Sequence, residues 1–128
     1  MKRGWTVIGE VLHGRRLGRE LGFPTANLGV PDDWAPADGV YRSRVTLDGR
    51  HYDAMSNLGC NPSVGGCRRR LETHLFGYAG DLYGRTLTVE LLEKVRDERT
   101  FASVEALRRQ LEQDRTAVER LIANDKKQ

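Results

Sequence analysis

Helical periodicity is confined to the C-terminal part of this 128-residue chain. Ser103 is a good N-cap candidate there, with Glu105 in the first turn, where the helix dipole favours an acid. Apolar residues then recur every three or four positions, interrupted at Asp114, in the order Val104, Leu107, Leu111, Val118, Leu121 and Ile122. No helix is expected between the preceding strands, which disfavours a parallel α/β sheet. We therefore expect an all-β antiparallel barrel of five or six strands, with one helix packed outside it.

Alternating residues and turn signals place these strands. The clearest signal is Asp48-Gly49, which separates two alternating runs and favours a hairpin with a type I′ turn. The turn-rich segment 31–36 is expected to be an irregular connection. The sequence predicts strands at 5–13, 41–47, 50–58, 70–76 and 86–95, with glycine-rich loops at about 14–29 and at 59–68 and a turn at 80–85.

Composition limits the class of protein and its partners. A hydrophobic content of 38% and a charged content of 30% describe a soluble globular chain, and no apolar run is long enough to span a bilayer. We expect a cytoplasmic protein with no membrane partner. The net charge of +3 is too small for a dedicated nucleic-acid binder, so no nucleic-acid partner is expected. Cys60 and Cys67 lack further ligands at metal-site spacing, so inert thiols fit better than a zinc site or a disulfide.

The stretch from Gly18 to Asn27 combines glycines, a cation, a proline and two short polar side chains. Glycine lets backbone N–H groups approach an anion closely, and proline fixes the direction in which the chain leaves the loop. The Thr25 hydroxyl and the Asn27 amide then offer hard oxygen donors of the kind that Mg²⁺ prefers beside phosphates. Because no Walker motif occurs, we interpret the loop as a nucleotide-phosphate site of another type. A local turn capped by the two polar side chains is the structural alternative.

A second candidate lies in the predicted strand 70–76. Glu72 and His74 share one face of that strand, whereas Leu71, Thr73 and Leu75 point to the other. Two interpretations stay open: either both polar residues are simply exposed to solvent, or the mouth of a barrel collects the carboxylate beside a ligand. In the second case Glu72 could accept a hydroxyl proton. A lone histidine such as His74 is more often packed or hydrogen-bonded than catalytic.

These motifs, in this order, resemble those of the riboflavin kinase family over nearly the whole chain. The resemblance begins at Gly9-x-Val11-x-His13-Gly14 and Gly18-Arg19-x-Leu21-Gly22-Phe23-Pro24-Thr25-Ala26-Asn27. It continues through Gly39-Val40-Tyr41, Asn57-Leu58-Gly59 with Asn61-Pro62, Leu71-Glu72-Thr73-His74-Leu75, Gly80-Asp81-Leu82-Tyr83-Gly84, Arg96-Asp97-Glu98 and Phe101-x-Ser103. The Pro-Thr-Ala-Asn motif is short, but its combination with a downstream Glu-x-His and Tyr-Gly is highly specific.

The resemblance implies a fold, a reaction and a set of site residues. The implied fold is a six-stranded antiparallel Greek-key barrel with a C-terminal helix. The implied reaction transfers the γ-phosphate of ATP to the 5′-hydroxyl of riboflavin, giving FMN and ADP, with Mg²⁺ as the metal ion. By motif position, the resemblance implies that Glu72 is the catalytic base and that Thr25 and Asn27 hold the metal and phosphates. It places the ATP loop at Gly14, Gly18, Arg19 and Gly22. It assigns flavin binding to Arg96 and Phe101. On the residues alone, Arg96 is read as part of an exposed connection and Phe101 as packing for the helix start.

The resemblance also bears on domain organisation. One kinase domain is expected over residues 1–128, with the barrel at about 4–96 and the helix at about 103–123. Many bacterial riboflavin kinases are the C-terminal half of a protein whose N-terminal half makes FAD. The histidine motif of that half is absent from this sequence, so we expect FMN as the end product, from a monomer. A non-catalytic module that binds flavin or nucleotide is the alternative function.

Overall fold

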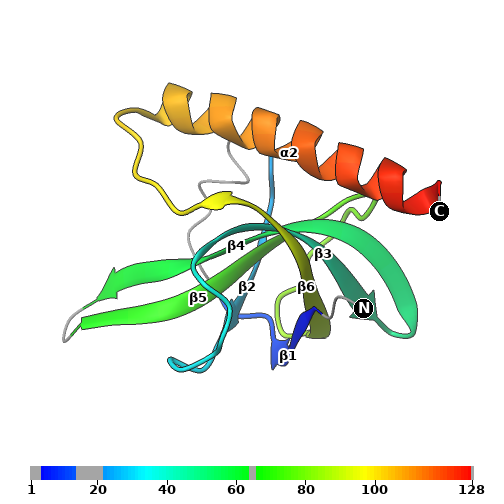
Figure 1. Cartoon of the computed structure of the whole chain (residues 1–128). Coiled ribbons are helices and arrows are strands. Elements are labelled where there is room, and N and C mark those ends of the chain that lie inside the picture. The colour runs from blue at the N-terminus through cyan, green and yellow to red at the C-terminus, as the bar shows by residue number, and fades with distance from the viewer. Residues whose placement is uncertain (1–3, 14–21, 64–65, 128) are drawn as a thin grey trace.

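A computed structural model of the chain describes residues 4–13, 22–63 and 66–127. Six strands in these residues form one antiparallel sheet in the order β1-β6-β3-β4-β5-β2, and a long helix follows. The elements are β1 (Trp5–Glu10), β2 (Ala26–Gly29), β3 (Gly39–Leu47), β4 (Arg50–Ser63), β5 (Gly66–Leu75), β6 (Thr86–Asp97) and α2 (Val104–Lys126). Figure 1 shows the curled sheet with α2 lying across one side of it.

The two edges of the sheet, β1 and β2, meet and nearly close it into a barrel. The backbone N–H of Leu12 donates to the Asn27 carbonyl over 2.7 Å, which forms an isolated bridge just after β1. The hairpin-linked strands β3, β4 and β5 are flanked by β6 beside β3 and by β2 beside β5, which is Greek-key topology. The expected six-stranded antiparallel barrel with a C-terminal helix is confirmed.

The β3–β4 turn is the one that the sequence predicted. Asp48 and Gly49 both have positive φ, 50° and 78°, as a type I′ turn requires. Two loop predictions are wrong. Residues 59–63 continue β4, and β5 starts at Gly66, because the two strands pair with each other beyond the barrel and form the arm seen in Figure 1. Ala26–Gly29, assigned to the glycine-rich loop, forms β2 because its backbone pairs with β5.

The barrel interior is packed with aliphatic side chains that alternate with outward-facing residues. Among the described residues, the larger of these side chains that are fully buried come from five strands: Leu28, Val45, Leu58, Leu71, Leu87, Val89 and Leu91. A chain of three hydroxyls lies among them. Ser56 Oγ is 2.7 Å from Ser43 Oγ and 2.8 Å from Thr73 Oγ1, so these buried polar groups satisfy one another.

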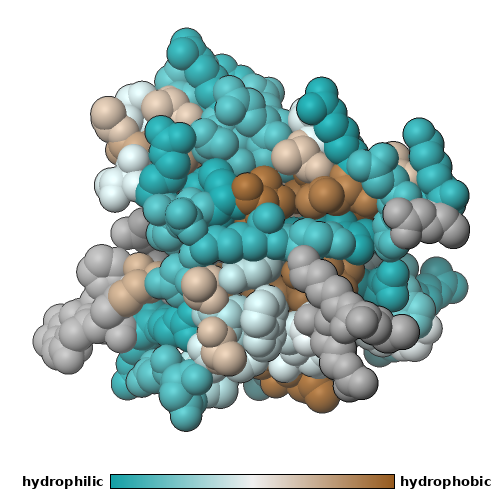
Figure 2. All heavy atoms as spheres, viewed as in Figure 1, coloured by the Kyte–Doolittle hydropathy of each residue, from teal (hydrophilic) through white to brown (hydrophobic). Residues whose placement is uncertain are grey.

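Helix α2 covers the outer face of the sheet. A second apolar cluster fills the seam, formed by buried Phe23, Val40, Met55 and Val118 with Phe76, Val95, Leu111 and Ile122 around them. Figure 2 shows hydrophobic side chains along this seam and hydrophilic ones over the outer side of the helix. Ser103 caps the helix as predicted, since its side chain accepts from the Ala106 N–H over 3.1 Å.

Two further observations concern expectations from composition. Cys60, in β4, is disulfide-bonded, so the expectation of an inert thiol is wrong for this residue. In the β4–β5 ladder Cys60 is paired with Arg69, where the sequence predicted a loop. Within the described residues, no helix has the length and apolar character needed to cross a membrane.

Candidate functional site

A cavity of about 150 Å³ lies between the outer face of the barrel and helix α2. Thr25 and Glu72 both border it, so two of the residues that the sequence singled out open into one space. The polar part of the lining consists of Thr25, Asn57, Glu72, His74 and Asp114, and the apolar part of Phe23, Val40, Met55, Leu107 and Leu111. The cavity therefore offers hydrogen-bonding groups together with an apolar wall, the combination typical of small-molecule sites.

Strand register explains why residues from distant parts of the sequence converge here. Glu72 of β5 is directly paired with Asn27 of β2 on one side and with Asn57 of β4 on the other. Asn57 in turn pairs with Val40, and Val40 with Arg96. Directly paired residues in an antiparallel sheet point to the same face. These five residues, which we call the outer row, therefore line up across five strands beneath α2.

The predicted metal and phosphate residues lie at one end of the outer row. Thr25 borders the cavity, and Asn27, which is 6% exposed, sits beside Glu72 without being part of the cavity lining. Gly22 has a φ of 87°, a left-handed conformation that glycine adopts without strain. The other predicted loop residues, Gly14, Gly18 and Arg19, lie outside the described residues.

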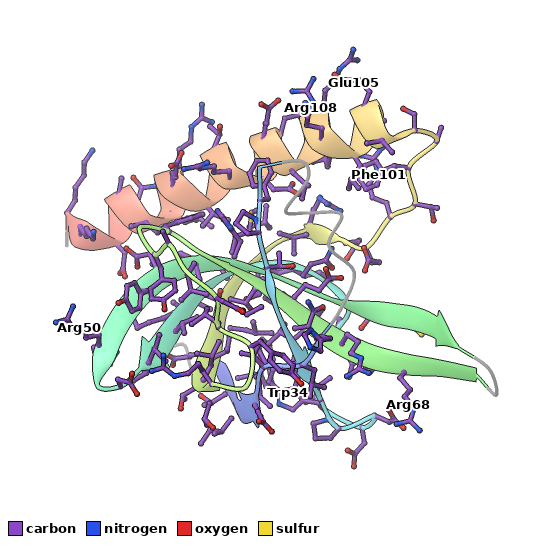
Figure 3. All side chains as sticks on the ribbon, turned by 180° about the vertical axis from the view of Figure 1, so that it is seen from behind. Trp34, Arg50, Arg68, Phe101, Glu105 and Arg108 are labelled. Atoms are coloured by element: carbon purple, nitrogen blue, oxygen red, sulfur yellow. The ribbon has the colours of Figure 1, made fainter. Side chains whose placement is uncertain are left out.

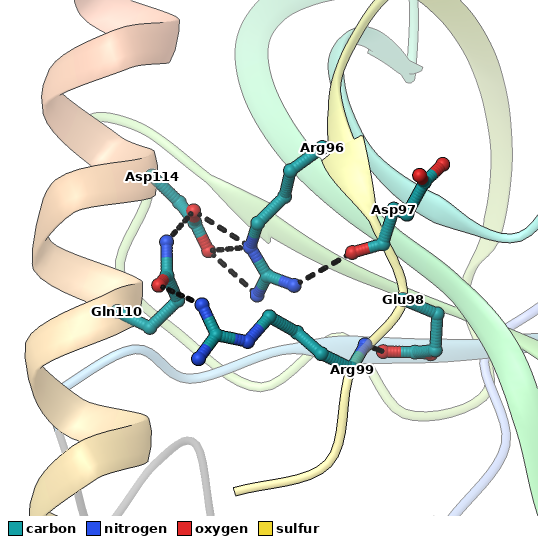
Figure 4. A network of polar contacts seen from close by, with 6 residues as sticks. All are labelled: Arg96, Asp97, Glu98, Arg99, Gln110 and Asp114. Carbon is teal, nitrogen blue, oxygen red and sulfur yellow. Dashed lines mark hydrogen bonds and ion pairs between the residues drawn. The ribbon is translucent and has the colours of Figure 1, made fainter.

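At the other end of the row, Arg96 is held by helix α2. Its Nε and Nη2 atoms each donate to the Asp114 carboxylate over 2.9 Å, and Nη1 donates to the Asp97 carbonyl over 3.0 Å. Gln110 donates to the same carboxylate over 2.9 Å (Figure 4). Asp114 is 1% exposed, which explains its place in the apolar helix period. Arg96 therefore acts on the cavity wall through Asp114.

Phe101, the other predicted flavin residue, lies in the connection between β6 and α2. The guanidinium carbons of Arg96 and Arg99 stand 5.5 and 4.9 Å from its ring centroid, within the range of cation–π contacts. Figure 3 shows Phe101 beside the start of α2, whereas Glu105 and Arg108 point away from the barrel. Neither Phe101 nor Arg96 borders the cavity, so the structure brings both close to its wall without exposing them to its interior.

Next to Asn57, the carboxylate of Glu98 lies close to Gly59 of β4, although Glu98 as a whole is exposed. A Cβ atom at Gly59 would collide with this carboxylate, so a larger residue there would require the flexible Glu98 side chain to move. Burial raises the pKa of Glu98, and the hydrogen bond from the Arg99 N–H, the Arg96 charge and a hydrogen bond with Asn57 oppose that rise.

Asn57 and Asp114 border the cavity but were not singled out as site residues from the sequence. The Oδ1 atom of Asn57 is buried and has no hydrogen-bond partner within the described part of the chain. The alternation in β4 could have placed Asn57 on the same face as Met55, but only the pairing with β5 brings it next to Glu72. Asp114 could have been found from the sequence, because it is an acidic residue that interrupts the apolar period of the predicted helix.

His13, part of the first family motif, is not among the residues that line the cavity. Its ring stacks on Tyr83, with centroids 3.7 Å apart and planes inclined by 15°. Of the cations at 68–70, Arg69 is committed to structure, because it donates to Asp38 and to the carbonyls of Trp34 and Pro36 over 2.7 to 3.2 Å. These contacts favour a packing role for Arg69 over phosphate binding.

Comparison with known proteins assigns the chain to a family. The family model described as "Flavokinase: Riboflavin kinase" matches residues 1–122. The chain is 43% identical over 122 residues to the bifunctional riboflavin kinase/FMN adenylyltransferase of Pseudomonas fluorescens, a match that covers 94% of this chain and 39% of that protein. The chain therefore belongs to the riboflavin kinase family, as its motifs predicted. It spans about two fifths of the length of that relative.

Two solved structures share the architecture. A crystal structure titled as a macrolide-efflux protein from Streptococcus pneumoniae superposes with a TM-score of 0.80 and 38% identity, over 89% of this chain and 38% of that one. The crystal structure of riboflavin kinase from Trypanosoma brucei gives a TM-score of 0.62 over 95% of this chain and 82% of that one. At 22% identity, the second likeness concerns the fold alone.

Proposed function

We propose that this chain is a riboflavin kinase that transfers the γ-phosphate of ATP to the 5′-hydroxyl of riboflavin, giving FMN and ADP. The observation that carries the proposal is the convergence of Thr25 and Glu72 on one cavity, with Asn27 paired to Glu72. Phosphoryl transfer needs positioning and charge stabilisation more than covalent help from the protein. One carboxylate as the base and oxygen donors beside it for the metal and phosphates are therefore sufficient for this reaction.

In this proposal Glu72 is the general base. Its carboxylate accepts the proton of the ribityl 5′-hydroxyl as that oxygen forms a bond to the γ-phosphorus, and the bond from this phosphorus to the bridging oxygen of ADP breaks. The apolar part of the wall, with Met55 from the barrel and Leu111 from the helix, suits the flat ring system of a flavin. Arg96 and Phe101 act on flavin binding by shaping this wall from behind.

The chain's own donors at Thr25 and Asn27 fit Mg²⁺. Both offer uncharged oxygen atoms, and Mg²⁺ is usually held by few protein groups together with substrate phosphates and water. Among the described residues, no three His, Cys, Asp or Glu side chains gather as a metal site, so further ligands come from phosphate oxygens and water. When bound, the ion neutralises charge on the transferring phosphate.

The test is to incubate the purified chain with riboflavin and Mg-ATP and to separate the flavins by chromatography. We expect FMN in equal amount to ADP, with no FAD. If the chain is instead a non-catalytic module, flavin or nucleotide should bind without release of ADP. Omission of the metal, with a chelator present, is expected to stop FMN formation, and re-addition of Mg²⁺ to restore it. Unchanged riboflavin after prolonged incubation would argue against the kinase assignment.

A further inference from the structure

The pairing between β2 and β5 stops one residue short of His74. It runs from Gly29 with Arg70 to Ala26 with Thr73, and the next pair in this register is Thr25 with His74. One residue further, Pro24 has no backbone N–H with which to extend the ladder. Here the side chain of His74 makes the link between the two segments, because its Nδ1 atom lies 2.8 Å from the Pro24 carbonyl oxygen.

This contact defines the proton on the imidazole. A carbonyl oxygen can only accept a hydrogen bond, so Nδ1 of His74 carries the hydrogen and donates it to Pro24. Burial lowers the pKa of His74, and the nearby charge of Arg115 lowers it further, so the ring is neutral at neutral pH. The His74 side chain of β5 is thus hydrogen-bonded to Pro24, the residue that precedes Thr25.

The ring of His74 is also fixed in orientation. Phe23 and Phe76 contact it edge-on, with ring centroids 5.6 and 5.5 Å away and planes inclined by 66° and 70°. Arg115 of helix α2 lies over both phenylalanine rings, at 6.0 and 5.6 Å from their centroids. Because neighbours hold the imidazole on several sides, its Nδ1–H has a defined direction.

We propose that His74 is a positioning residue for phosphoryl transfer. Its Nδ1–H holds the Pro24 carbonyl, and so sets the place of the Thr25 hydroxyl relative to the Glu72 carboxylate across the shared cavity. The inference rests on the proposed kinase function, because it assigns His74 to the alignment of the phosphate side of the site with the base. A shift of about 1 Å in such an alignment can lower a rate about 100-fold.

Three variants of His74 separate donor geometry from ring packing. His74→Phe keeps a ring without a donor, His74→Asn places an N–H close to the Nδ1 position, and His74→Gln places it one bond further out. We expect His74→Phe to lower kcat/KM for Mg-ATP by about 10- to 100-fold, with KM for riboflavin changed by less than about 3-fold. His74→Asn is expected to recover most of the loss and His74→Gln little of it.

A second measurement does not depend on turnover. In ¹⁵N NMR spectra of the unmodified chain at neutral pH, we expect the tautomer of His74 with hydrogen on Nδ1, and slow amide exchange at Ala26 that becomes faster in His74→Phe. Hydrogen on Nε2 instead would overturn the proposal. So would an unchanged kcat/KM in His74→Phe, equal losses in His74→Phe and His74→Asn, or equal losses for both substrates. If the unmodified chain forms no FMN, the kinase function fails, and the NMR result still decides whether the contact exists.

Discussion

Polar residues on the two faces of the barrel wall differ in how their hydrogen bonds are satisfied. Ser56 and Asn57 are consecutive residues of β4, and Thr73 and Glu72 are consecutive residues of β5, so each pair presents one residue to each face. Inside, Ser56 bonds to Thr73 and to Ser43, and all three hydroxyls are buried. Outside, Asn57 and Glu72 border the cavity beneath α2, and Asn57 Oδ1 finds no partner in the described part of the molecule.

A step of one residue along a strand thus separates a structural polar group from a candidate functional one. The inner hydroxyls are uncharged and satisfy one another, so they need nothing beyond the barrel. The outer row presents the Glu72 carboxylate and the Asn57 amide to a cavity that a small molecule can enter. At the far end of the row, Arg96 is ion-paired with Asp114. The comparison therefore predicts separate consequences for the inner hydroxyls, for Glu72 at the cavity and for the Arg96–Asp114 pair, which we call the paired end.

The largest effect is expected at the paired end, for Asp114→Asn. The substitution removes the carboxylate that faces Arg96, whose side chain is 14% exposed, and so leaves a nearly buried charge without its partner. Loss of one member of a buried ion pair lowers the free energy of unfolding by about 3–5 kcal/mol. Urea unfolding measures this change, with Glu112→Gln on the exposed side of α2 as a control expected to differ by less than about 0.5 kcal/mol. Equal stability of both variants would mean that the paired end is not structural.

The next effect is expected at the cavity, for Glu72→Gln. The substitution keeps the shape of the side chain but removes the group that accepts the hydroxyl proton, so kcat should fall by about 100-fold or more. The midpoint of thermal unfolding should stay close to that of the unmodified chain, because Gln has nearly the same size and shape as Glu and keeps hydrogen-bonding capacity. Initial rates of FMN formation and a thermal melt on the same sample check both parts. A near-normal rate would remove Glu72 from the mechanism.

The same two faces show what the sequence could predict. Alternation placed Leu71, Thr73 and Leu75 on one face and Glu72 with His74 on the other, and the structure confirms this arrangement. Period-2 patterns are reliable where one face is buried, because a slip of one residue would expose the whole apolar set. The motif order then identified the family and predicted the fold, which the strand topology confirms.

What the sequence did not predict depends on partners that are remote in the chain. The strand at Ala26–Gly29 is short and glycine-containing, and it exists because β5 supplies its hydrogen bonds. The burial of Asp114 depends on Arg96, 18 residues earlier, which local periodicity cannot reveal. The role of Asn57 in the outer row likewise follows from β4–β5 register, which turn signals alone did not fix.

A smaller effect is expected inside the barrel, for Thr73→Val. The substitution keeps the shape of the side chain but removes the hydroxyl that lies 2.8 Å from Ser56 Oγ. Because Ser56 keeps its contact with Ser43, the free energy of unfolding should fall by about 1 kcal/mol. Urea unfolding checks this value, and kcat for FMN formation should stay within about 2-fold of the unmodified chain. A loss of activity comparable to that of Glu72→Gln would contradict the division between the two faces.

The smallest effect concerns pH and His74, on the outer face. Its folded-state pKa lies below the ordinary 6.5 because the ring is buried and Arg115 is near. The unfolded chain therefore takes up this proton at a higher pH than the folded chain does. The stability that the neutral ring contributes is complete above pH 6.5 and is lost as the pH falls below this value. Urea unfolding at about pH 7.5 and about pH 5.5 should show a decrease for the unmodified chain that is smaller for His74→Phe, which cannot titrate. An equal decrease in the two proteins would assign the acid sensitivity to carboxylates elsewhere and leave His74 without a part in it.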